Sequence, residues 1–247
     1  MGRLIVLSGP SCVGKGPLME AVRRFYPEIA GAIRNLVIYN SRGPRPGERD
    51  GVEYHFRLRE EIEEFRGRDD FLVMEIRGDL QAIDLSAMEH CLARGDLFFE
   101  ANPIMIDAMI THGIYDKTNT LSVFLSPLSR EEIEFLKAVK PKVALGEFIT
   151  DLMRRKLLRR TQRQKTILSL PDLQNIEVRA ASALMEMRFA PLYDHVLPNH
   201  DGEDCDNWYA SYHPIGDARK TMVAFAQLLQ GQMPRIAETW PDNLLGS

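Results

Sequence analysis

The feature that most constrains the fold of this chain is a glycine-rich segment that ends in a Lys-Gly pair. Residues 9–16 read GPSCVGKG and lie between an apolar run at 4–7 and a helical pattern at 18–25. In that strand–loop–helix setting, the spacing Gly-x-x-x-x-Gly-Lys is typical of a loop whose backbone N–H groups surround phosphate oxygens. The start of the following helix carries partial positive charge, and Lys15 adds a full charge. The segment therefore predicts a phosphate-binding loop in an α/β fold.

Short apolar runs alternate with helical patterns along the rest of the chain. The runs lie at 36–39, 71–76, 97–99, 121–125 and 193–197. Strands separated by amphipathic helices favour right-handed βαβ units and a mainly parallel sheet with helices on both faces. We therefore expect an α/β protein built as a three-layer αβα sandwich.

The composition favours one soluble globular domain and excludes several classes of protein. Of the 247 residues, 45% are hydrophobic and 27% are charged, and the formal net charge of −4 argues against nonspecific nucleic-acid binding. The three cysteines, Cys12, Cys91 and Cys205, form no Cys-x-x-Cys pair, so we expect a reducing compartment without disulfides. The N-terminal apolar run is too short for a signal peptide, and no later stretch is apolar enough to span a bilayer. We therefore expect a cytoplasmic protein.

A second segment, at 40–56, concentrates arginine, proline and glycine and reads NSRGPRPGERDGVEYHF. Arg42 and Arg45 are held near each other by the proline between them, and Tyr54 adds a hydroxyl donor. Two guanidinium groups and a phenol suit a phosphate monoester, which accepts bidentate charge-assisted hydrogen bonds. By composition alone, a charged surface loop explains this segment at least as well.

A basic helical pattern lies at 154–165, where seven Lys and Arg residues occur without an acidic one. Arg155, Arg159 and Arg163 share one face because they are spaced by four residues. One hypothesis is a lid whose arginines close over the phosphates of a nucleotide. The alternatives are a solvated face and, with less support, a strip that binds RNA or another polyanion.

A later loop, at 199–208, mixes His, Asp, Glu and Cys in the sequence NHDGEDCDNW. Its spacing matches neither a zinc site nor a calcium site. We therefore expect a capped, solvated turn at these residues.

The first two segments together resemble the guanylate kinase family. That family carries a Gly-Pro-Ser-Gly-x-Gly-Lys loop, followed by Thr-Thr-Arg-x-Pro-Arg-x-Gly-Glu-x-x-Gly-x-x-Tyr-x-Phe. The matching stretches here are GPSCVGKG and NSRGPRPGERDGVEYHF. The likeness continues less specifically through 69–79, 97–102, 123–129 and 177–199, so it covers most of the chain in order.

The resemblance implies one P-loop kinase domain at 1–233, followed by a tail at 234–247. A β-rich acceptor-binding excursion at 39–84 and a helical lid at 137–176 would interrupt the core of the domain. The core would then consist of three segments: 1–38, 85–136 and 177–233.

The resemblance also implies an activity, the phosphorylation of GMP to GDP with ATP and Mg²⁺. ATP would bind at the loop and at one distant asparagine: Gly9, Pro10, Ser11, Cys12, Val13, Gly14, Lys15, Gly16 and Asn199. The implied catalytic residues are Lys15, Arg179, Arg155, Arg159 and Glu100, and the implied acceptor-binding residues are Arg42, Arg45, Tyr54 and Asn102. Because Gly16 follows Lys15 where a hydroxyl residue is usual, Glu100 would reach the magnesium ion through water. We expect no nucleic-acid or membrane partner, and a monomer or a homodimer.

Three positions depart from the family pattern where the acceptor would bind. Val73 stands in place of a Glu, Gln81 in place of a Tyr and Asn102 in place of an Asp. Loss of a carboxylate that accepts from guanine costs about 2 kcal/mol or more in base discrimination. Two alternatives to a guanylate kinase therefore stay open: a kinase of the same fold with another small phosphorylated acceptor, and a non-catalytic guanylate-kinase-like binding module. The glycine–lysine loop and the basic helix argue against the module.

Overall fold

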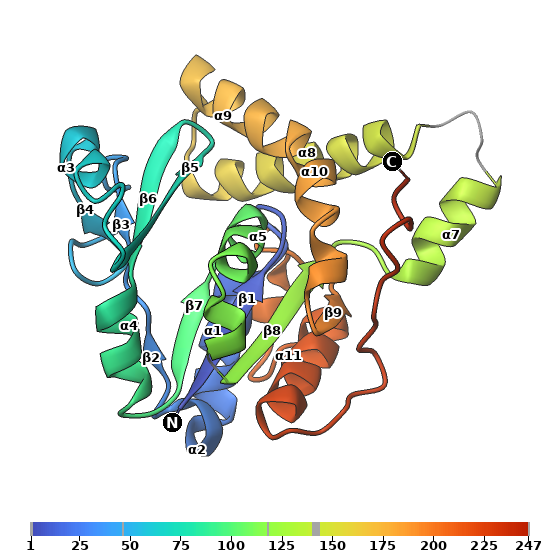
Figure 1. Cartoon of the computed structure of the whole chain (residues 1–247). Coiled ribbons are helices and arrows are strands. Elements are labelled where there is room, and N and C mark those ends of the chain that lie inside the picture. The colour runs from blue at the N-terminus through green and yellow to red at the C-terminus, as the bar shows by residue number, and fades with distance from the viewer. Residues whose placement is uncertain (1, 46, 118, 140–143, 247) are drawn as a thin grey trace. The chain divides into compact units, whose positions relative to one another are not determined.

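Figure 1 shows the computed structural model and labels its helices and strands. The chain divides into two compact units. The residues that the structure describes are 2–45, 47–117, 119–139 and 144–246. Pro46 and residues 140–143 of the expected lid lie outside these ranges, as does Ser247 at the end of the expected tail. Unit 1 consists of 1–6, 32–100 and 104–121, and unit 2 of 7–31, 101–103 and 122–247.

Unit 1 holds most of the short strands. Its elements, in chain order, are β1 (Arg3–Ser8, which ends in unit 2), β2 (Arg34–Asn35), β3 (Tyr39–Asn40), β4 (His55–Phe56), α3 (Arg59–Glu63), β5 (Phe71–Ile76), β6 (Asp79–Asp84), α4 (Leu85–Leu92), β7 (Leu97–Glu100), α5 (Pro103–Thr111) and α6 (Ile114–Lys117). β8 (Asn119–Ser126) begins in unit 1 and continues in unit 2.

Unit 2 is mainly helical. Its elements are α1 (Lys15–Phe25), α2 (Pro27–Ala30), α7 (Arg130–Val139), α8 (Leu145–Gln164), α9 (Leu170–Ala181), α10 (Ala183–Met187), the 3-10 turns η1 (Ala190–Leu192) and η2 (Asp206–Trp208), β9 (His195–Pro198) and α11 (Gly216–Leu229).

The strands of the described residues form two sheets. One is a parallel sheet of five strands in the order β2-β7-β1-β8-β9, and the other has four strands in the order β4-β3-β6-β5. In the first sheet, β2 pairs with β7 and β8 pairs with β9, both in parallel. Parallel neighbours that are not consecutive in the chain need crossover connections, which helices supply. The predicted α/β class with a parallel core sheet is confirmed.

The second sheet contains a strand that the apolar runs did not predict. β5 and β6 form an antiparallel hairpin closed by Arg77 and Gly78, whose φ angles are 54° and 88°. Positive φ at both turn positions gives the twist that a two-residue hairpin favours. On one face, Leu80 and Ala82 of β6 pack with Ile62 of α3. This small cluster is the apolar core of the second sheet.

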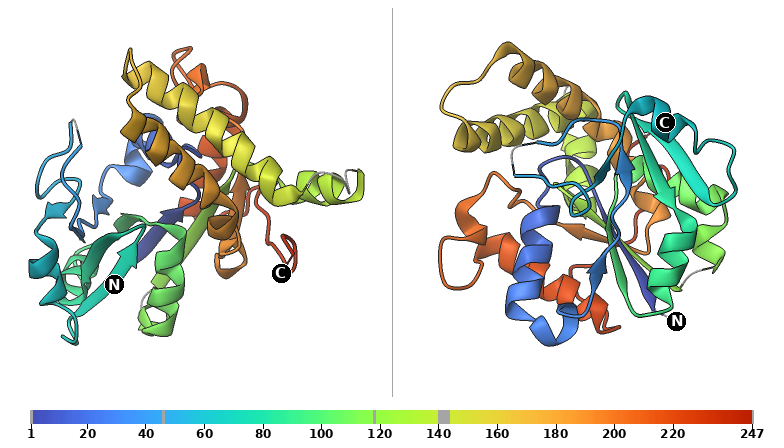
Figure 2. Two further views of the ribbon diagram at one scale, coloured as in Figure 1. Left: turned by 90° about the horizontal axis from the view of Figure 1, so that it is seen from above. Right: turned by 90° about the vertical axis from the view of Figure 1, so that its left-hand side faces the viewer.

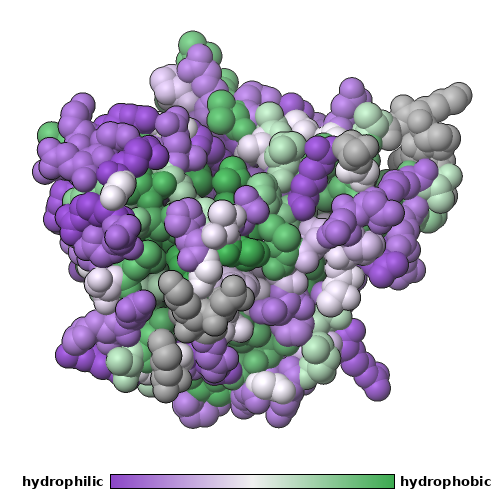
Figure 3. All heavy atoms as spheres, in the orientation of Figure 1, coloured by the Kyte–Doolittle hydropathy of each residue, from purple (hydrophilic) through white to green (hydrophobic). Residues whose placement is uncertain are grey.

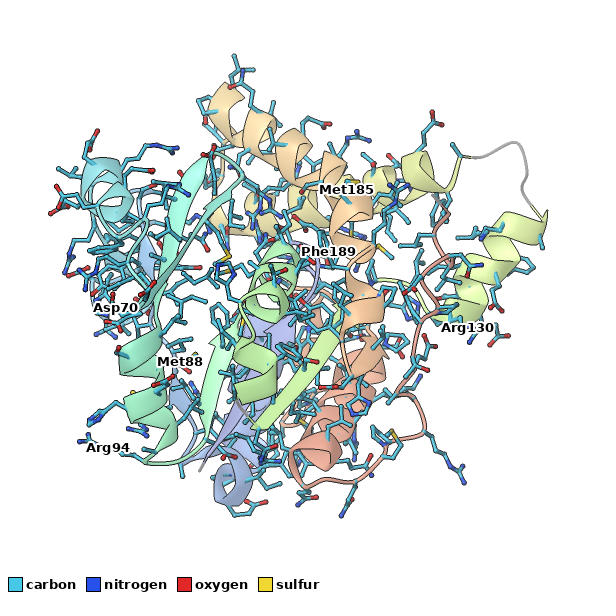
Figure 4. All side chains as sticks on the ribbon, in the orientation of Figure 1. Asp70, Met88, Arg94, Arg130, Met185 and Phe189 are labelled. Atoms are coloured by element: carbon cyan, nitrogen blue, oxygen red, sulfur yellow. The ribbon has the colours of Figure 1, made fainter. Side chains whose placement is uncertain are left out.

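Side chains on the elements next to the hairpin are either buried against its strands or charged and exposed. Met88 of α4, labelled in Figure 4, is buried, and α4 packs against both β5 and β6. Asp70, also labelled there, pairs with Arg68 on the exposed side just before β5. The outer residues of α3 are charged and exposed, which agrees with the hydrophilic surface over this helix in Figure 3.

The apolar run at 36–39, expected to form one strand, instead connects the two sheets, and only Tyr39 belongs to a strand. β2 ends at Asn35 and belongs to the five-stranded sheet, whereas β3 begins at Tyr39 and belongs to the four-stranded sheet. The residues between them carry the chain from one sheet to the other, so an unbroken apolar run does not make a single strand here.

In unit 2, α8 and α9 lie side by side (Figures 1 and 2). Ser169 accepts a hydrogen bond from Asp172 N, and the Asp172 side chain accepts from Ser169 N and Oγ. This reciprocal capping box, with Pro171 in the first turn, starts α9. The sequence SLPD at 169–172 therefore forms the beginning of a helix.

Candidate active site

The glycine–lysine loop of unit 2 has a backbone that only glycine supports at two positions. Gly9 has φ 140° and Gly14 has φ 105°. A Cβ at Gly9 would lie 2.3 Å from Leu125 O, and a Cβ at Gly14 would lie 2.7 Å from Asn199 Nδ2. Both positions combine a conformation that L-residues avoid with close packing, so the two glycines give the loop its tight shape.

Lys15 is the first residue of α1 and is buried against the loop. Its Nζ donates hydrogen bonds to Gly9 O at 3.0 Å and Pro10 O at 3.1 Å. The ammonium charge is thus held at the inner side of the loop, next to the N-terminus of a helix. In the same loop, burial raises the pKa of the Cys12 thiol to about 12. Cys12 is therefore a neutral thiol at physiological pH and does not act as a nucleophile.

Two residues from distant parts of unit 2 contact this loop. Arg179, near the end of α9, donates from Nε to Ser11 Oγ at 3.0 Å. Asn199, directly after β9, is fully buried and donates from Nδ2 to Val13 O at 2.7 Å and to Asp201 O at 2.9 Å. The structure thus brings together the loop, Lys15, Arg179 and Asn199. Their assignment to ATP and to catalysis stays a prediction.

The arginines of α8 differ in burial and in partners. Arg155 has a side chain 71% exposed and pairs with Asp151 of its own helix. Arg159 has one 58% exposed and pairs with Asp204. Arg160, to which the sequence interpretation gave no role, is 15% exposed, and its Nη1 donates to Glu203 Oε2 at 2.8 Å. The roles expected for Arg155 and Arg159 stay predictions.

Glu203 belongs to the loop that was expected to be a solvated turn. Burial alone would raise the pKa of this carboxyl, but the charges of Arg160 and Lys15, the hydrogen bond from Arg160 and the charge of Arg179 lower it below its usual value. Glu203 is therefore ionised and lies in a strongly positive environment. No spacing rule for this loop pointed to that environment.

In unit 1, a cavity of about 310 Å³ collects most of the residues expected to bind the acceptor. Arg42, Arg45 and Tyr54 line it together with Glu100 at the end of β7. The lining is completed by polar and apolar residues from β2, the segment between β2 and β3, the segment between β3 and β4, and β7: Asn35, Leu36, Ile38, Glu48, Val52, Glu53, Phe98 and Phe99. Asn102, the other residue expected at the acceptor, belongs to unit 2.

Arg42 is held in place by a carboxylate and by aromatic rings. Its Nη1 and Nη2 donate to the two carboxylate oxygens of Glu48 at 2.6 and 2.7 Å. The guanidinium carbon lies 4.9 Å from the ring centroid of Tyr54 and 5.5 Å from that of Phe56. Glu48 also accepts from the backbone N of Arg45 at 2.8 Å. The sequence interpretation missed this role of Glu48, although its place between the two arginines and Tyr54 was a signal.

Tyr54 keeps its proton in this setting. Burial and the charge of Glu100 raise the pKa of the phenol, and the charge of Arg42 only partly offsets them. At neutral pH the cavity therefore contains a hydroxyl donor beside a fixed guanidinium group. Such a pair can donate hydrogen bonds to two oxygens of one anion, for example two of the terminal oxygens of a phosphate monoester.

Two of the three positions that depart from the family pattern, Val73 and Gln81, lie in the second sheet. Val73 of β5 packs against the apolar cluster around Leu80 and Ala82. Gln81 of β6 stands opposite Met74 of β5 in the antiparallel ladder. An apolar side chain that packs in this way cannot accept a hydrogen bond from a base, so Val73 does not replace the expected carboxylate.

Among the described residues, no cluster of side chains is arranged to bind a metal ion directly. Within the described ranges, His, Cys, Asp and Glu side chains nowhere gather in groups of three that could hold a metal ion. Gly16 offers no side-chain ligand after Lys15. The assignment of Glu100 to magnesium through water stays a prediction. In the same ranges, every helix is too short or too polar to cross a membrane.

The glycine–lysine loop joins β1, a strand of the parallel sheet, to the helix α1. This arrangement defines the class of P-loop nucleotide-binding proteins. The family model described as guanylate kinase matches residues 1–96. The guanylate kinase of Alkalilimnicola ehrlichii is 31% identical over 246 residues, which cover 98% of each chain. The chain therefore belongs to the guanylate kinase family, whose members are nucleoside-monophosphate kinases. The resemblance seen in the sequence and the predicted enzyme class are confirmed.

Other similarities agree with this family. The guanylate kinases of Synechococcus sp. and Clostridium perfringens are 34% and 35% identical over 136 residues. Those residues are 54% of this chain and cover 58% and 59% of the two relatives. The crystal structure of guanylate kinase from Anaplasma phagocytophilum superposes with a TM-score of 0.54 at 18% identity, over 93% of this chain and 85% of that one. This last similarity supports the fold alone.

Proposed function

We propose that the protein transfers the γ-phosphoryl group of ATP to GMP and produces ADP and GDP. The observation that carries this proposal is 31% identity to a guanylate kinase along 98% of both chains. The geometry supports it because each of the two units contains a feature suited to phosphate, one for a donor and one for an acceptor.

The donor feature is the glycine–lysine loop of unit 2. Its tight backbone, which a Cβ at Gly9 or Gly14 would disrupt, suits close approach of phosphate oxygens to the main chain. Lys15 and Arg179 supply positive charge at the loop. Asn199 fixes the carbonyl of Val13 and so holds the loop in shape. These residues fit a nucleotide polyphosphate.

The acceptor feature is the cavity of unit 1. Arg42, fixed by Glu48, and Arg45 would bind the phosphate of GMP through their guanidinium groups. Tyr54, which keeps its proton, would donate its hydroxyl hydrogen to the same phosphate. Since Arg42 is already fixed by its carboxylate and rings, little side-chain entropy is lost when the acceptor binds.

Phosphoryl transfer between two such sites needs positioning and charge stabilisation rather than a covalent enzyme intermediate. Lys15, Arg179 and one or more arginines of α8 would stabilise the negative charge on the transferred group. Magnesium would enter with ATP and neutralise part of the phosphate charge, with Glu100 reaching it through water. Asn102, after β7, would hydrogen-bond the acceptor.

A coupled assay of ADP release with a panel of nucleoside and sugar monophosphates tests this proposal. We expect turnover with GMP well above that with every other acceptor. Preferred turnover of another phosphorylated acceptor would replace GMP in the proposal. Absence of turnover, together with absence of ATP binding by calorimetry, would contradict the kinase and favour a binding module.

Lys15→Ala gives a matched test of the donor feature. The variant should lose activity because the loop loses its only ammonium group, since Lys15 is the one lysine between residues 9 and 16. Lys137→Ala is the control, because Lys137 of α7 likewise donates to a backbone oxygen, Leu244 O at 2.9 Å, away from the loop. The control should keep wild-type activity, and full activity of Lys15→Ala would refute the site.

A further inference from the structure

One carboxylate lies among the cations of the donor feature. Glu203 accepts a hydrogen bond from Arg160 Nη1 at 2.8 Å, and the charges of Lys15 and Arg179 also lower the pKa of its carboxyl, although burial opposes them. Lys15 and Arg179 both contact the glycine–lysine loop. The carboxylate of Glu203 is therefore paired with Arg160 and lies within electrostatic range of Lys15 and Arg179, close to the loop at which the proposed ATP would bind.

Glu203 is carried by a segment that is tied to the same loop. We call residues Asp201–Asp206 the acidic segment. Glu203 N donates to Cys12 O at 3.3 Å, and a Cβ at Gly202 would lie only 2.1 Å from that oxygen. The acidic segment thus runs directly over the glycine–lysine loop, and its position is fixed by the main chain rather than by Glu203 alone.

The acidic segment is also joined to α8 by a row of ion pairs. Lys156 pairs with Asp204 at 3.5 Å, and Arg159 pairs with the other oxygen of Asp204 at 3.1 Å. A further pair joins Arg163 and Asp206 at 3.0 Å. Since these pairs hold the segment on α8, removal of the charge of Glu203 leaves the segment attached.

Arg160 uses only part of its hydrogen-bonding capacity on Glu203. Its Nη1 is bonded to the carboxylate, but its Nε is buried and has no hydrogen-bond acceptor among the described residues. A guanidinium group with an unused N–H can form more hydrogen bonds to a ligand that offers oxygens to two of its N–H groups. A phosphate group offers such oxygens, and more negative charge than a carboxylate.

We propose that Glu203 is an internal counter-ion that donor phosphates displace, so that Arg160 exchanges the carboxylate for a phosphate oxygen of the nucleotide. The Glu203 side chain is 23% exposed, so it has access to solvent when it leaves Arg160. Glu203 then sets the affinity for the donor: its negative charge holds the cation cluster together and opposes the entry of a second anion. This inference rests on the proposed binding of ATP at the glycine–lysine loop.

Calorimetric titration with inorganic tripolyphosphate, and separately with ATP and Mg²⁺, tests the exchange. Glu203→Gln keeps the shape of the side chain and removes its charge, so both ligands should bind about tenfold more tightly. Asp206→Asn is the matched control, because it removes the same charge from the same segment at a side chain that is 81% exposed. The control should change the affinity less than twofold. A Glu203→Gln affinity equal to that of wild type overturns the proposal, and Glu203→Ala repeats the test if the Gln variant is unstable.

A double variant that combines Arg160→Met with Glu203→Gln distinguishes partner exchange from simple charge repulsion between Glu203 and the ligand. Arg160→Met should weaken tripolyphosphate binding about tenfold, whereas Arg154→Met, whose arginine pairs with Glu177 of α9, should not. If Arg160 exchanges partners, Glu203→Gln tightens binding less than twofold once Arg160 is replaced. If the double variant binds tripolyphosphate a full tenfold more tightly than Arg160→Met alone, the exchange is contradicted.

The same titrations distinguish failure of this inference from failure of the proposed function. If the wild-type protein binds neither tripolyphosphate nor ATP, the kinase proposal itself fails. If it binds both and Lys15→Ala abolishes binding while Glu203→Gln and Arg160→Met have no effect, only the exchange is wrong.

Discussion

Replacement of Gly14 by alanine tests whether the shape of the glycine–lysine loop depends on the absence of a side chain. Gly14 has φ 105°, a conformation that costs an L-residue about 1–3 kcal/mol. The new Cβ would lie 2.7 Å from Asn199 Nδ2 and 3.1 Å from Asp201 O. If Asn199 moves, its buried hydrogen bonds to Val13 O and Asp201 O weaken, at about 1 kcal/mol each. We therefore expect Gly14→Ala to lower the free energy of unfolding of unit 2 by about 3–5 kcal/mol.

Urea denaturation followed by tryptophan fluorescence measures this change. Both tryptophans, Trp208 and Trp240, belong to unit 2, and Trp208 Cζ2 would lie 3.3 Å from the new Cβ. Gly16→Ala is the matched control, because no heavy atom lies within 4 Å of a Cβ there and alanine favours the helix by about 0.5–1 kcal/mol. Unfolding of Gly14→Ala at the wild-type urea concentration, or equal destabilisation of Gly16→Ala, would show that the loop does not depend on the absence of a side chain at Gly14.

Three further experiments have expected outcomes. Arg42→Met should raise the KM for GMP about 10- to 100-fold, because a charge-assisted hydrogen bond is lost and the charge of Glu48 is left uncompensated. An unchanged KM in steady-state kinetics would contradict the acceptor site. Burial alone would lower the pKa of His200, but hydrogen bonds to Glu132 and Asp217 raise that pKa overall. The stability that His200 contributes is therefore present below about pH 6.5 and is lost as the pH rises through the folded-state pKa. The difference in unfolding free energy between wild type and His200→Gln should therefore be larger at about pH 6 than at about pH 9, and a constant difference would refute the assignment. Mass spectrometry after brief alkylation of the folded protein should find Cys12 unmodified, because the thiol is buried with a pKa of about 12, and rapid modification would show that the loop opens.

The glycine–lysine loop could be predicted because its chemistry is local. Eight consecutive residues contain the glycines that need unusual φ angles and the lysine that supplies the charge. The contacts of Arg179 and Asn199 with this loop join residues 168 and 186 positions apart. No local spacing predicts such contacts, and they were expected only through the resemblance to a family.

The acidic segment shows what sequence patterns could not provide. Read alone, residues 199–208 have the composition of a solvated turn, and α8 has that of a solvated basic face. The structure pairs the two, and Arg160 meets Glu203 across 43 positions of sequence. Which arginine of α8 is buried depends on this pairing, so helical periodicity could not single out Arg160 from Arg155 or Arg159.

The hairpin of unit 1 was missed for a different reason. β6 has its apolar residues in alternation, with Leu80 and Ala82 on one face, and is too polar in total to stand out as an apolar run. Its turn, Arg77-Gly78, has a non-glycine residue at positive φ and is a weaker hairpin signal than Asn-Gly. The run at 36–39 misled in the opposite direction, because its apolar residues connect two sheets instead of forming one strand.

The most direct measurement follows the phosphoryl group itself. ATP labelled in its γ-phosphate is incubated with GMP and the protein, and the nucleotides are separated. We expect the label to move into GDP with the wild-type protein and to remain in ATP with Lys15→Ala. Label that never reaches GDP, or that reaches it equally without Lys15, would contradict the assignment of the glycine–lysine loop as the donor site of a guanylate kinase.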